Sequence, residues 1–510
     1  MNVESNELLR GYRVENKPKE ECGVFGIFFP HPEHIKDIGQ ITIKGMFPNQ
    51  HRGEESSGIV VADGQEIFHP FKKMGLIKKL YEEFSDLPYK PKGFIGIGHN
   101  RYSTTGSSNI KNAAPFISQE LGGFAVSHNG NITNVELLKR SLIEKSIEFK
   151  STTDSEIICA LISNENGKSW EEKIVNGLSK LDGAFSLVMC SKDTLYAARD
   201  PWGIRPLYIA KIIRDGVEGY AISSETPSFY VLSVNGFCIE SSREVLPGEL
   251  IIINNSGIKN TNFSPPKKES FCGLEIAYLM RPDSRLGNIQ LDSIRRHLGK
   301  KLAENYYLPK DIDFVTYIPE SSRSGAEGFA EAVSLPVKTT MIKGRYGTID
   351  GAIRGFISPN DAIRREVAKG NYFPLDILKD KKIVLMDDSV IRGRTTGGVI
   401  NTIKYGVGLL RKSGAKEVHV RIIFPPVIGG CPLGVDIGKN EWLVAKEYKN
   451  TKDIAQFLNV DSIEYLSDKE YQEGVNEILK ARRGLCLGCA NGIYPIDSLN
   501  INKHIFEEKL

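Results

Sequence analysis

The sequence has no long apolar run and no apolar segment near its beginning. None of its stretches approaches the roughly 18 consecutive apolar residues that a membrane-spanning helix needs. Residues 1–21 alternate acidic and basic side chains and lack the apolar core of a secretory signal. These absences predict a cytoplasmic protein that has no membrane partner.

The chain is also poor in cysteine and nearly balanced in charge. Eight cysteines among 510 residues are too few for a disulfide scaffold, so clustered cysteines are interpreted first as catalytic or metal-binding. The 66 basic and 63 acidic residues leave a formal net charge of +3, too little for binding nucleic acid by bulk electrostatics. With 40% hydrophobic and 25% charged residues, the composition excludes a disordered chain. The length predicts about two to four domains.

The pattern of strands divides the chain into two parts. Residues 22–255 contain many short β runs separated by Gly, Asn or Pro, which is typical of a sheet-rich α+β domain. The polar Pro- and Lys-containing stretch 255–270 resembles a linker. In residues 271–485, apolar strands such as 382–388 and 418–424 alternate with helix patterns. This alternation predicts an α/β domain with a parallel sheet.

The segment IVLMDDSVIRGRTTGG at 383–398 is the most informative part of the second domain. Its two carboxylates follow a buried strand, at the sheet edge where open α/β sheets bind ligands. Hydroxyl, glycine and basic residues then precede a helix, whose amides and positive end favour a phosphate. The carboxylates suit ribose hydroxyls or a hydrated Mg²⁺, although an ordinary capped turn is the simpler alternative. The residues expected at this phosphate site are Asp387, Asp388, Ser389, Arg392, Gly393, Arg394 and Thr395.

A cysteine, Cys22, stands at the head of the first predicted strand. On its own it could be an ordinary small residue of a buried strand. If the chain is cleaved after Glu21, however, the new α-amino group has a pKa near ~8 and can take the proton of the thiol. Nucleophile and base would then belong to one residue, and the charged segment 1–21 fits a removable propeptide.

Polar clusters at predicted loops of the first domain supply partners for this cysteine. Arg101 could hold a carboxylate bidentately, and Asp154 could hold an ammonium group. Asn129 and the backbone N–H of Gly130 could form an oxyanion hole. Each residue alone would more often be surface structure. Together with Cys22, they predict an amide-hydrolysing site for glutamine.

Several of these segments resemble known families. ECGVFGIF, GHNRYSTTG, SHNGNITN and TDSEII resemble the class II glutamine amidotransferases, and MDDSVIRGRTT resembles the phosphoribosyl-pyrophosphate (PRPP) loop of type I phosphoribosyltransferases. In order, and over residues 22–495, the chain is most similar to the amidophosphoribosyltransferases. The resemblance implies an α+β N-terminal-nucleophile (Ntn) hydrolase domain, an αββα sandwich, at 22–255. An α/β type I phosphoribosyltransferase domain follows at 271–485.

The resemblance also implies a reaction and its partners. PRPP, glutamine and water would give 5-phosphoribosylamine, pyrophosphate and glutamate, the first committed step of purine biosynthesis. Purine nucleotides are expected as feedback ligands, and the chain is expected to form a homo-oligomer, either a dimer or a tetramer. Two alternatives stay open from the residues: another class II glutamine amidotransferase, or a regulatory paralogue that binds PRPP or nucleotides without turnover.

A further residue and a loop are added to the second site by the resemblance. Ser321, in YIPESSRSGAEGFA, matches a position that lies with Asp387 and Asp388 at the Mg²⁺–PRPP centre of relatives, with one ion per subunit. The basic stretch 343–374 corresponds to a loop that closes over PRPP. Arg394 replaces a threonine of the family pattern and adds a cation to the phosphate loop.

The last group of candidate functional residues consists of four cysteines. Cys486 and Cys489 make a C-x-x-C pair, whereas Cys272 and Cys431 are single and distant in sequence. From the residues alone, the C-x-x-C pair could be redox-active, part of a zinc site or incidental, and four thiolates could equally hold an iron–sulfur cluster. The resemblance implies one [4Fe–4S] cluster per subunit, as in the propeptide-bearing branch of the family. The cluster would tie the C-terminal segment 486–510 to the two domains.

Overall fold

The computed structural model describes most of the chain from Cys22 onward. The described residues are 22–30, 33, 35, 37–102, 109–343, 372–391, 402–435, 437, 443–448 and 450–496. Three predicted features lie outside them: the propeptide at 1–21, most of the basic stretch 343–374, and the phosphate-loop residues Arg392, Gly393, Arg394 and Thr395. Within the described residues, no helix is long and apolar enough to cross a membrane.

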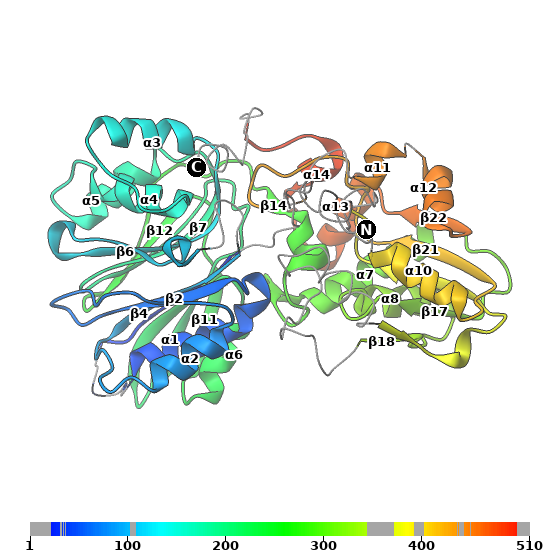
Figure 1. Cartoon of the computed structure of the whole chain (residues 1–510), viewed down its shortest axis with the longest axis horizontal. Helices are drawn as coiled ribbons and strands as arrows, with labels where there is room; N and C mark the ends of the chain where they lie inside the picture. Colours follow the sequence, from blue (N-terminus) through cyan, green and yellow to red (C-terminus); the bar gives the residue numbers. More distant parts are fainter. Residues whose placement is uncertain are drawn as a thin grey trace, which may run out of the picture.

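Two antiparallel sheets pack face to face in the first domain (Figure 1). One sheet has the order β11–β9–β10–β1–β4–β2–β3 and the other has the order β13–β12–β8–β7–β6–β5. The strands of the first sheet are β1 (Gly23–Phe28), β2 (Ser56–Ala62), β3 (Phe71–Met74), β4 (Ile95–Arg101), β9 (Tyr208–Arg214), β10 (Val217–Ser223) and β11 (Cys238–Glu244). Those of the second are β5 (Phe116–Ser118), β6 (Phe124–Ile132), β7 (Gly183–Ser191), β8 (Leu195–Arg199), β12 (Glu249–Asn254) and β13 (Gly257–Asn262).

Helices cover both outer faces of this pair of sheets (Figure 1). The seven-stranded sheet is covered by α1 (Ile38–Met46), α2 (Ile77–Ser85) and α6 (Pro227–Val234). The six-stranded sheet is covered by α3 (Val135–Glu144), α4 (Asp154–Ser163) and α5 (Trp170–Leu178), with α4 directly on β6. The predicted αββα sandwich is therefore confirmed.

The alternation of side chains along β1 explains its central place in the sandwich. Val24 and Phe28 are buried between the two sheets, whereas Phe25 and Ile27 are buried on the side of the helices. Such a strand must be covered on both faces. On the helical side, Gly45 of α1 lies so close to the Phe25 ring that an added Cβ would come within 2.2 Å of a ring carbon. Position 45 is therefore glycine because the Phe25 ring leaves no room there for a side chain.

The predicted linker at 255–270 begins with a strand that the sequence reasoning missed. Gly257–Asn262 form β13, which pairs antiparallel with β12 at the edge of the six-stranded sheet. Most of its side chains are exposed, so its polar composition is that of an edge strand and not of a free linker. Gly257, with φ of +107°, makes the tight turn between the two strands. The sheet of the first domain therefore extends beyond residue 255.

A four-stranded parallel sheet forms the centre of the second domain. Its order is β17 (Phe314–Tyr317), β20 (Lys382–Asp387), β21 (Glu417–Ile422) and β22 (Ser462–Tyr465). All three neighbouring pairs are parallel. The helices are α7 (Leu291–Asn305), α8 (Arg323–Val333) and α13 (Asp468–Leu479) on one face, and α10 (Thr402–Lys412) and α12 (Thr451–Leu458) on the other. The predicted α/β domain with a parallel sheet is confirmed.

The described chain also contains several short elements. They are β14 (Phe271–Cys272), a π-helical turn (Glu275–Leu279), β15 (Arg285–Leu286), β16 (Ile289–Gln290), β18 (Met341–Lys343), β19 (Tyr372–Pro374), α11 (Val444–Glu447), β23 (Leu485–Cys486) and α14 (Gly488–Asn491). Short 3₁₀ turns occur at Phe47–Arg52, Ile110–Asn112, Glu120–Gly122 and Asp376–Leu378. β14 pairs in parallel with β23, so the beginning and the end of the second domain lie side by side.

Candidate active site

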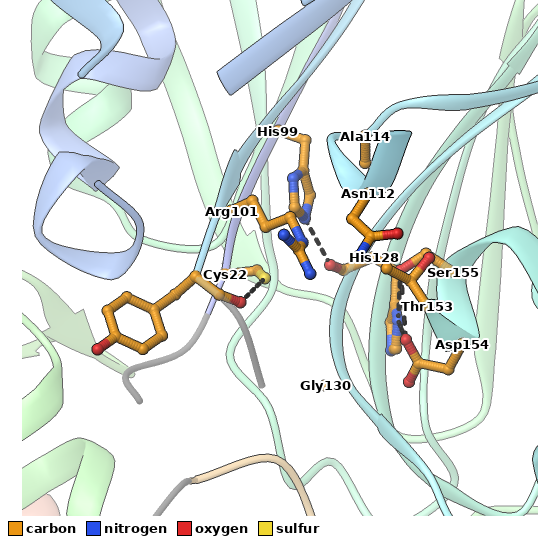
Figure 2. A pocket seen from close by; sticks show the side chains of 11 residues that line it. Cys22, His99, Arg101, Asn112, Ala114, His128, Gly130, Thr153, Asp154 and Ser155 are labelled. Atoms are coloured by element: carbon orange, nitrogen blue, oxygen red, sulfur yellow. Dashed lines mark hydrogen bonds and ion pairs between the residues drawn. The ribbon is translucent and has the colours of Figure 1, made fainter. Parts of the chain in front are cut away.

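Cys22 lies directly before β1, next to the end of β4. Its Sγ–H donates to the carbonyl oxygen of Tyr102 at 3.5 Å. Four of the residues predicted for glutamine, Cys22, Arg101, Gly130 and Asp154, line a single pocket (Figure 2). The fold thus brings together residues from four separate sequence motifs.

The thiol of Cys22 is in a protected environment. Burial raises its pKa to about 11, against the opposing effects of the Tyr102 carbonyl and the Arg101 guanidinium. At neutral pH such a thiol is protonated, so its use as a nucleophile requires a base close to the sulfur. The α-amino group of a chain that began at residue 22 would be such a base.

A guanidinium and a carboxylate flank the pocket on opposite sides (Figure 2). Arg101 ends β4 and is 3% exposed, and its NH1 group donates to Oε1 of Glu55 at 2.5 Å. Asp154 is the first residue of α4 and is 6% exposed. This arrangement is complementary to the α-carboxylate and α-ammonium groups of an amino acid.

Asp154 is held in its ionised form by three neighbours. Its Oδ2 atom accepts from the backbone N–H of Ile132 at 3.2 Å, and its Oδ1 atom lies 3.4 Å from Ser155 Oγ and 3.5 Å from Nδ1 of His128. Burial alone would raise the pKa of Asp154, but His128 and these hydrogen bonds lower it below its ordinary value. The side chain is therefore a carboxylate at neutral pH, as an ammonium site requires.

The two residues predicted for the oxyanion hole follow each other on β6. Within the described part of the chain, neither amide atom of the fully buried Asn129 side chain has a hydrogen-bond partner. Leaving a buried polar group unpaired costs roughly 1–3 kcal/mol, and such exceptions call for an explanation. Gly130 has φ of +148°, and its missing Cβ would lie 1.9 Å from the carbonyl oxygen of Ala184. Only glycine fits this close approach between β6 and β7.

The second predicted site lies where β20 ends. Asp387 and Asp388 are 7% and 3% exposed. Oδ1 of Asp387 accepts from Ser322 Oγ at 2.8 Å, and Oδ1 of Asp388 accepts from Ser389 Oγ at 3.2 Å. The Ser321 hydroxyl is also near Asp388 and lowers the pKa of that carboxyl. Ser321, Asp387, Asp388 and Ser389 therefore meet at one edge of the parallel sheet.

These two carboxylates are close together and poorly compensated. Burial, and then the charge of its neighbour, raises the pKa of Asp387 well above its ordinary value. Burial also raises the pKa of Asp388, against the effects of Ser321 and Arg295. Among the described residues, Oδ2 of Asp388 has no hydrogen-bond partner. Two adjacent buried carboxylates with hydroxyl neighbours are oxygen donors of the kind that a hard divalent cation prefers.

The four cysteines also gather in one region. Cys272 and Cys486 are register partners in the β14–β23 pair. The carbonyl oxygen of Cys489 accepts from the N–H groups of Ile428 and Gly429, just before Cys431. Burial raises the pKa of Cys489, and the other three cysteines raise it further. Nevertheless, no group of three or more His, Cys, Asp or Glu side chains in the described ranges has the arrangement of a metal site.

Comparisons with known proteins agree with this geometry. The sequence model of a family described as a glutamine amidotransferase domain matches residues 99–230. The chain is 34% identical over 490 residues to the amidophosphoribosyltransferase of Synechococcus elongatus, covering 95% of this chain and 93% of the relative. It is 35% identical over 506 residues to that of Methanocaldococcus jannaschii, covering 96% of this chain and all of the relative.

A solved structure extends the agreement to three dimensions. The glutamine PRPP amidotransferase from Bacillus subtilis, complexed with ADP and GMP, matches with a TM-score of 0.80 at 34% identity, over 94% of this chain and 99% of that chain. The chain belongs to the amidophosphoribosyltransferase family. The predicted family, the two-domain fold and the enzyme class are thereby confirmed. The alternative of a different class II glutamine amidotransferase is set aside, because the amidophosphoribosyltransferases match over both domains.

Two histidines line the same pocket as Cys22 and were missed by the sequence reasoning. His128 contacts Asp154, and Nε2 of His99 lies 2.9 Å from the carbonyl oxygen of His128. Burial lowers the pKa of His99 to about 3, so its imidazole is neutral. A signal was present, because each histidine precedes an asparagine in one of the two motifs GHNRY and SHNGN.

Two residues near the carboxylate pair were missed as well. Ser322 was not distinguished from Ser321, yet it is the hydroxyl that contacts Asp387. Arg295 lies on α7, is 1% exposed, and its charge acts on Asp388. No local pattern marks an arginine within an amphipathic helix as part of a site, because only the packing of α7 onto α8 brings it there.

Proposed function

We propose that the chain catalyses the glutamine-dependent conversion of PRPP to 5-phosphoribosylamine, with glutamate and pyrophosphate as the other products. The observation that carries the proposal is the presence, in one chain, of a pocket that joins Cys22 to Arg101 and Asp154 and of a buried carboxylate pair at the edge of a parallel sheet. The first site suits glutamine and the second suits a phosphorylated ribose with a cation.

In the first site, Cys22 attacks the side-chain amide of glutamine. Arg101 binds the substrate carboxylate and Asp154 binds its ammonium group. The Asn129 side-chain amide and the Gly130 backbone N–H stabilise the oxyanion of the tetrahedral intermediate. The α-amino group freed by removal of residues 1–21 takes the thiol proton and returns it to the departing ammonia.

In the second site, the residues present fit a Mg²⁺ ion. Asp387, Asp388 and Ser321 would hold it, one ion per subunit, and their burial next to one another is costly without a cation. When bound, the ion neutralises charge on the departing pyrophosphate. Ser389 and the backbone after it bind phosphate before the following helix, and Arg392, Gly393, Arg394 and Thr395 complete this loop.

The two sites depend on each other for chemical reasons. Ammonia released into water is mostly protonated and loses its nucleophilicity, whereas a dry path between the sites keeps it neutral. Purine nucleotides act as feedback ligands, a role supported by the ADP and GMP named for the Bacillus subtilis structure. The chain works as a cytoplasmic homo-oligomer, a dimer or a tetramer.

The cysteine quartet binds one [4Fe–4S] cluster per subunit with a structural role. Support comes from the donor set, since Cys272, Cys431, Cys486 and Cys489 lie in one partly buried region and each has the thiol that such clusters use. With no cation, burial and the neighbouring cysteines raise the pKa of the Cys272, Cys486 and Cys489 thiols, which keeps these three protonated. A bound cluster would link β14, the 431–435 segment and the C-terminal residues from 486 onward.

Metal analysis of anaerobically purified protein tests this assignment. We expect about four iron and four sulfide ions per chain, from the composition of the cluster, and both should be lost in a Cys486→Ser variant. Cys238→Ser is the matched control, because that cysteine is exposed on β11, far from the quartet in sequence. One zinc ion per chain, without iron or sulfide, would contradict the cluster.

Steady-state turnover tests the proposed function itself. With PRPP, Mg²⁺ and glutamine, we expect glutamate and pyrophosphate to appear in equal amounts over many turnovers per chain. Turnover numbers of typical enzymes, about 1–10³ per second, set the scale. Binding of PRPP without release of pyrophosphate would instead support the regulatory paralogue.

A further inference from the structure

Four charged side chains are buried together where the two domains meet. Arg52, Arg205 and Glu225 come from the first domain, and Glu275 comes from the π-helical turn that opens the second. Glu225, Glu275 and Arg205 are 0% exposed and Arg52 is 2% exposed. We call this set the junction cluster. Because ions are rarely buried so completely, their arrangement needs an explanation.

Arg52 is the centre of the junction cluster. Its NH1 and NH2 groups donate to the two carboxylate oxygens of Glu275 at 3.2 and 2.5 Å. Its Nε group donates to Oε1 of Glu225 at 2.6 Å. Such a two-pronged pair fixes the orientation of both side chains. Arg52 is therefore held in place from the second domain as well as from its own.

The backbone that follows Arg52 leads directly to the glutamine pocket. Gly53 lies so close to β4 that an added Cβ would come within 2.6 Å of the carbonyl carbon of Asn100 and 2.7 Å of that of Arg101. Two residues later, Glu55 binds Arg101 twice, through its backbone N–H to the Arg101 carbonyl and through its carboxylate to the guanidinium. The position of Arg52 therefore affects the backbone of residues 53–55, which contacts Arg101 directly.

Arg205 connects the junction cluster to β6, the strand that carries Gly130. Its NH1 group lies 3.5 Å from Oε1 of Glu275, and its Nε and NH2 groups donate to the Leu433 carbonyl at 3.2 and 2.6 Å. Gly434, the next residue, packs against Gly130, and its missing Cβ would lie 3.2 Å from the Gly130 carbonyl carbon. The 431–435 segment is also held by Asn131, whose Nδ2 donates to Pro432 O at 2.9 Å.

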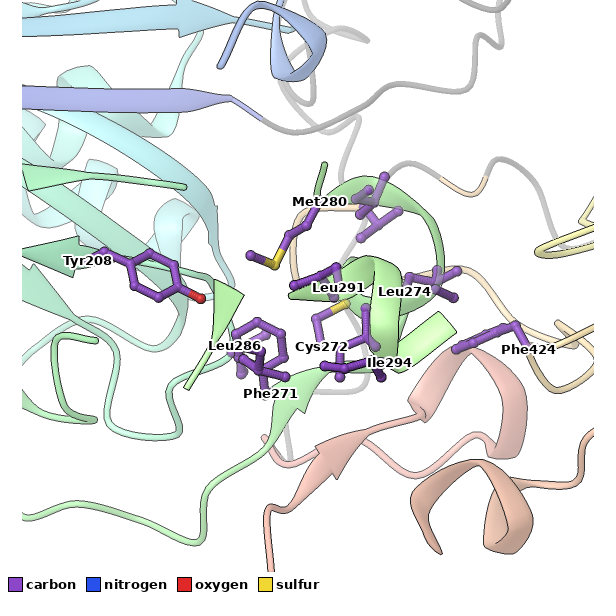
Figure 3. Close-up of a cluster of buried hydrophobic side chains, with 14 of the residues drawn as sticks. Tyr208, Phe271, Cys272, Leu274, Met280, Leu286, Leu291, Ile294 and Phe424 are labelled. Carbon is purple, nitrogen blue, oxygen red and sulfur yellow. The ribbon is translucent and has the colours of Figure 1, made fainter. Parts of the chain in front are cut away.

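The turn that carries Glu275 is fixed on its other side by the second domain. Arg295 of α7 donates to the carbonyl oxygens of Ile276 and Met280 at 2.8 and 2.6 Å, and its charge also acts on Asp388. Met280, Leu291 and Ile294 pack around this turn (Figure 3). π-helical turns often occur at functional sites.

We propose that Glu275, a residue of the second domain, is a positioning residue for glutamine hydrolysis in the first domain. Through its hydrogen bonds to Arg52, Glu275 positions Arg101. Through its ion pair with Arg205, it positions the part of β6 around Gly130. Glu275 itself touches neither substrate. The inference rests on the proposed function, because it concerns the glutamine site of that reaction.

The test replaces Glu275 with glutamine, which keeps the shape and removes the charge. Three activities of purified E275Q are compared with those of the wild type: glutamine hydrolysis, glutamine-dependent synthesis and ammonia-dependent synthesis. We expect kcat/KM for glutamine to fall about 10²-fold, because small misplacements of binding groups have effects of that size. The KM for glutamine should rise because Arg101, which binds the substrate carboxylate, is displaced. The kcat should fall because Gly130, which stabilises the oxyanion, is displaced. Ammonia-dependent synthesis should stay within about twofold of the wild type.

A second ion pair at the same junction, partly buried, provides a control. Arg483 of the second domain donates to both carboxylate oxygens of Glu244, a residue of β11, with NH1 at 3.0 Å and NH2 at 2.5 Å. Neither residue contacts the glutamine pocket or the carboxylate pair in the described structure. E244Q should therefore leave kcat/KM for glutamine within about twofold of the wild type, although it also removes a charge from an ion pair between the two domains.

The outcomes separate the inference from the function on which it rests. Absence of turnover in the wild type would refute the proposed function, whatever the variants do. With an active wild type, an equal loss of glutamine- and ammonia-dependent synthesis in E275Q, or the same glutamine defect in E244Q, would overturn the positioning role. Should E275Q not fold, E275D retains the charge but is one methylene shorter. We expect a glutamine-specific defect of about tenfold in E275D, and none would contradict the proposal.

Discussion

Replacing Cys22 with alanine should reduce the rate of glutamine-dependent 5-phosphoribosylamine synthesis by about 10⁴-fold or more, as expected when an enzyme loses its nucleophile. The Cys22 thiol lines the described pocket next to Arg101, and Asp154 lines its opposite side. Ammonia-dependent synthesis should stay within about twofold, since the second site is unchanged. Pyrophosphate release, measured with glutamine and then with ammonium chloride at alkaline pH, checks both statements.

A control for this variant is available in the same domain. Cys190 is fully buried in β7, and its replacement by alanine removes a core thiol without touching the pocket. Cys190→Ala should keep the ratio of glutamine- to ammonia-dependent activity, even if the protein is somewhat less stable. If Cys22→Ala lost both activities while remaining folded, separate sites for ammonia production and ammonia use would be excluded.

Replacing Asp388 with asparagine should have the opposite selectivity. Synthesis should fall about 10²–10³-fold with either nitrogen source, because a charged ligand for the cation and the sugar phosphate is lost. Hydrolysis of glutamine at Cys22 should persist. Measuring glutamate and pyrophosphate in the same reaction distinguishes the two effects, since glutamate should continue to appear without pyrophosphate.

The stability of the Asp388 variant provides an internal check. Without Mg²⁺, Asp387 and Asp388 repel each other in a buried place, so removing one charge relieves the strain. The melting temperature of Asp388→Asn should therefore equal or exceed that of the wild type when both are measured in a chelator. Unfolding of the variant at the assay temperature would instead attribute the lost activity to lost structure and not to the loss of a ligand.

Features encoded in contiguous residues could be predicted from the sequence. The alternation in β1, the apolar strand before Asp387 and the short motifs around Arg101, Asn129 and Asp154 each depend on neighbouring residues, and their order indicated both domains. β13 was missed because an exposed edge strand is polar and has no apolar alternation to detect.

Features that depend on packing could not be predicted in this way. Arg295 and Ser322 reach the carboxylate pair only because α7, α8 and β20 pack together. The pair of Arg52 and Glu275 joins residues from two domains, and neither residue lies in a pattern that announces its partner. Contacts of this kind follow from tertiary structure, which local propensity does not contain.

The pairing of β14 with β23 has a consequence for the order of events during synthesis on the ribosome. All strands of the αββα sandwich precede β14, so that domain can fold while the rest of the chain is still being made. β14 must instead wait for β23, which is translated only after the whole parallel sheet. Cys272 therefore meets Cys486 only near the end of translation. Until then, the nascent second half lacks its closing contact, and this is the period in which a chaperone would have the longest access to it.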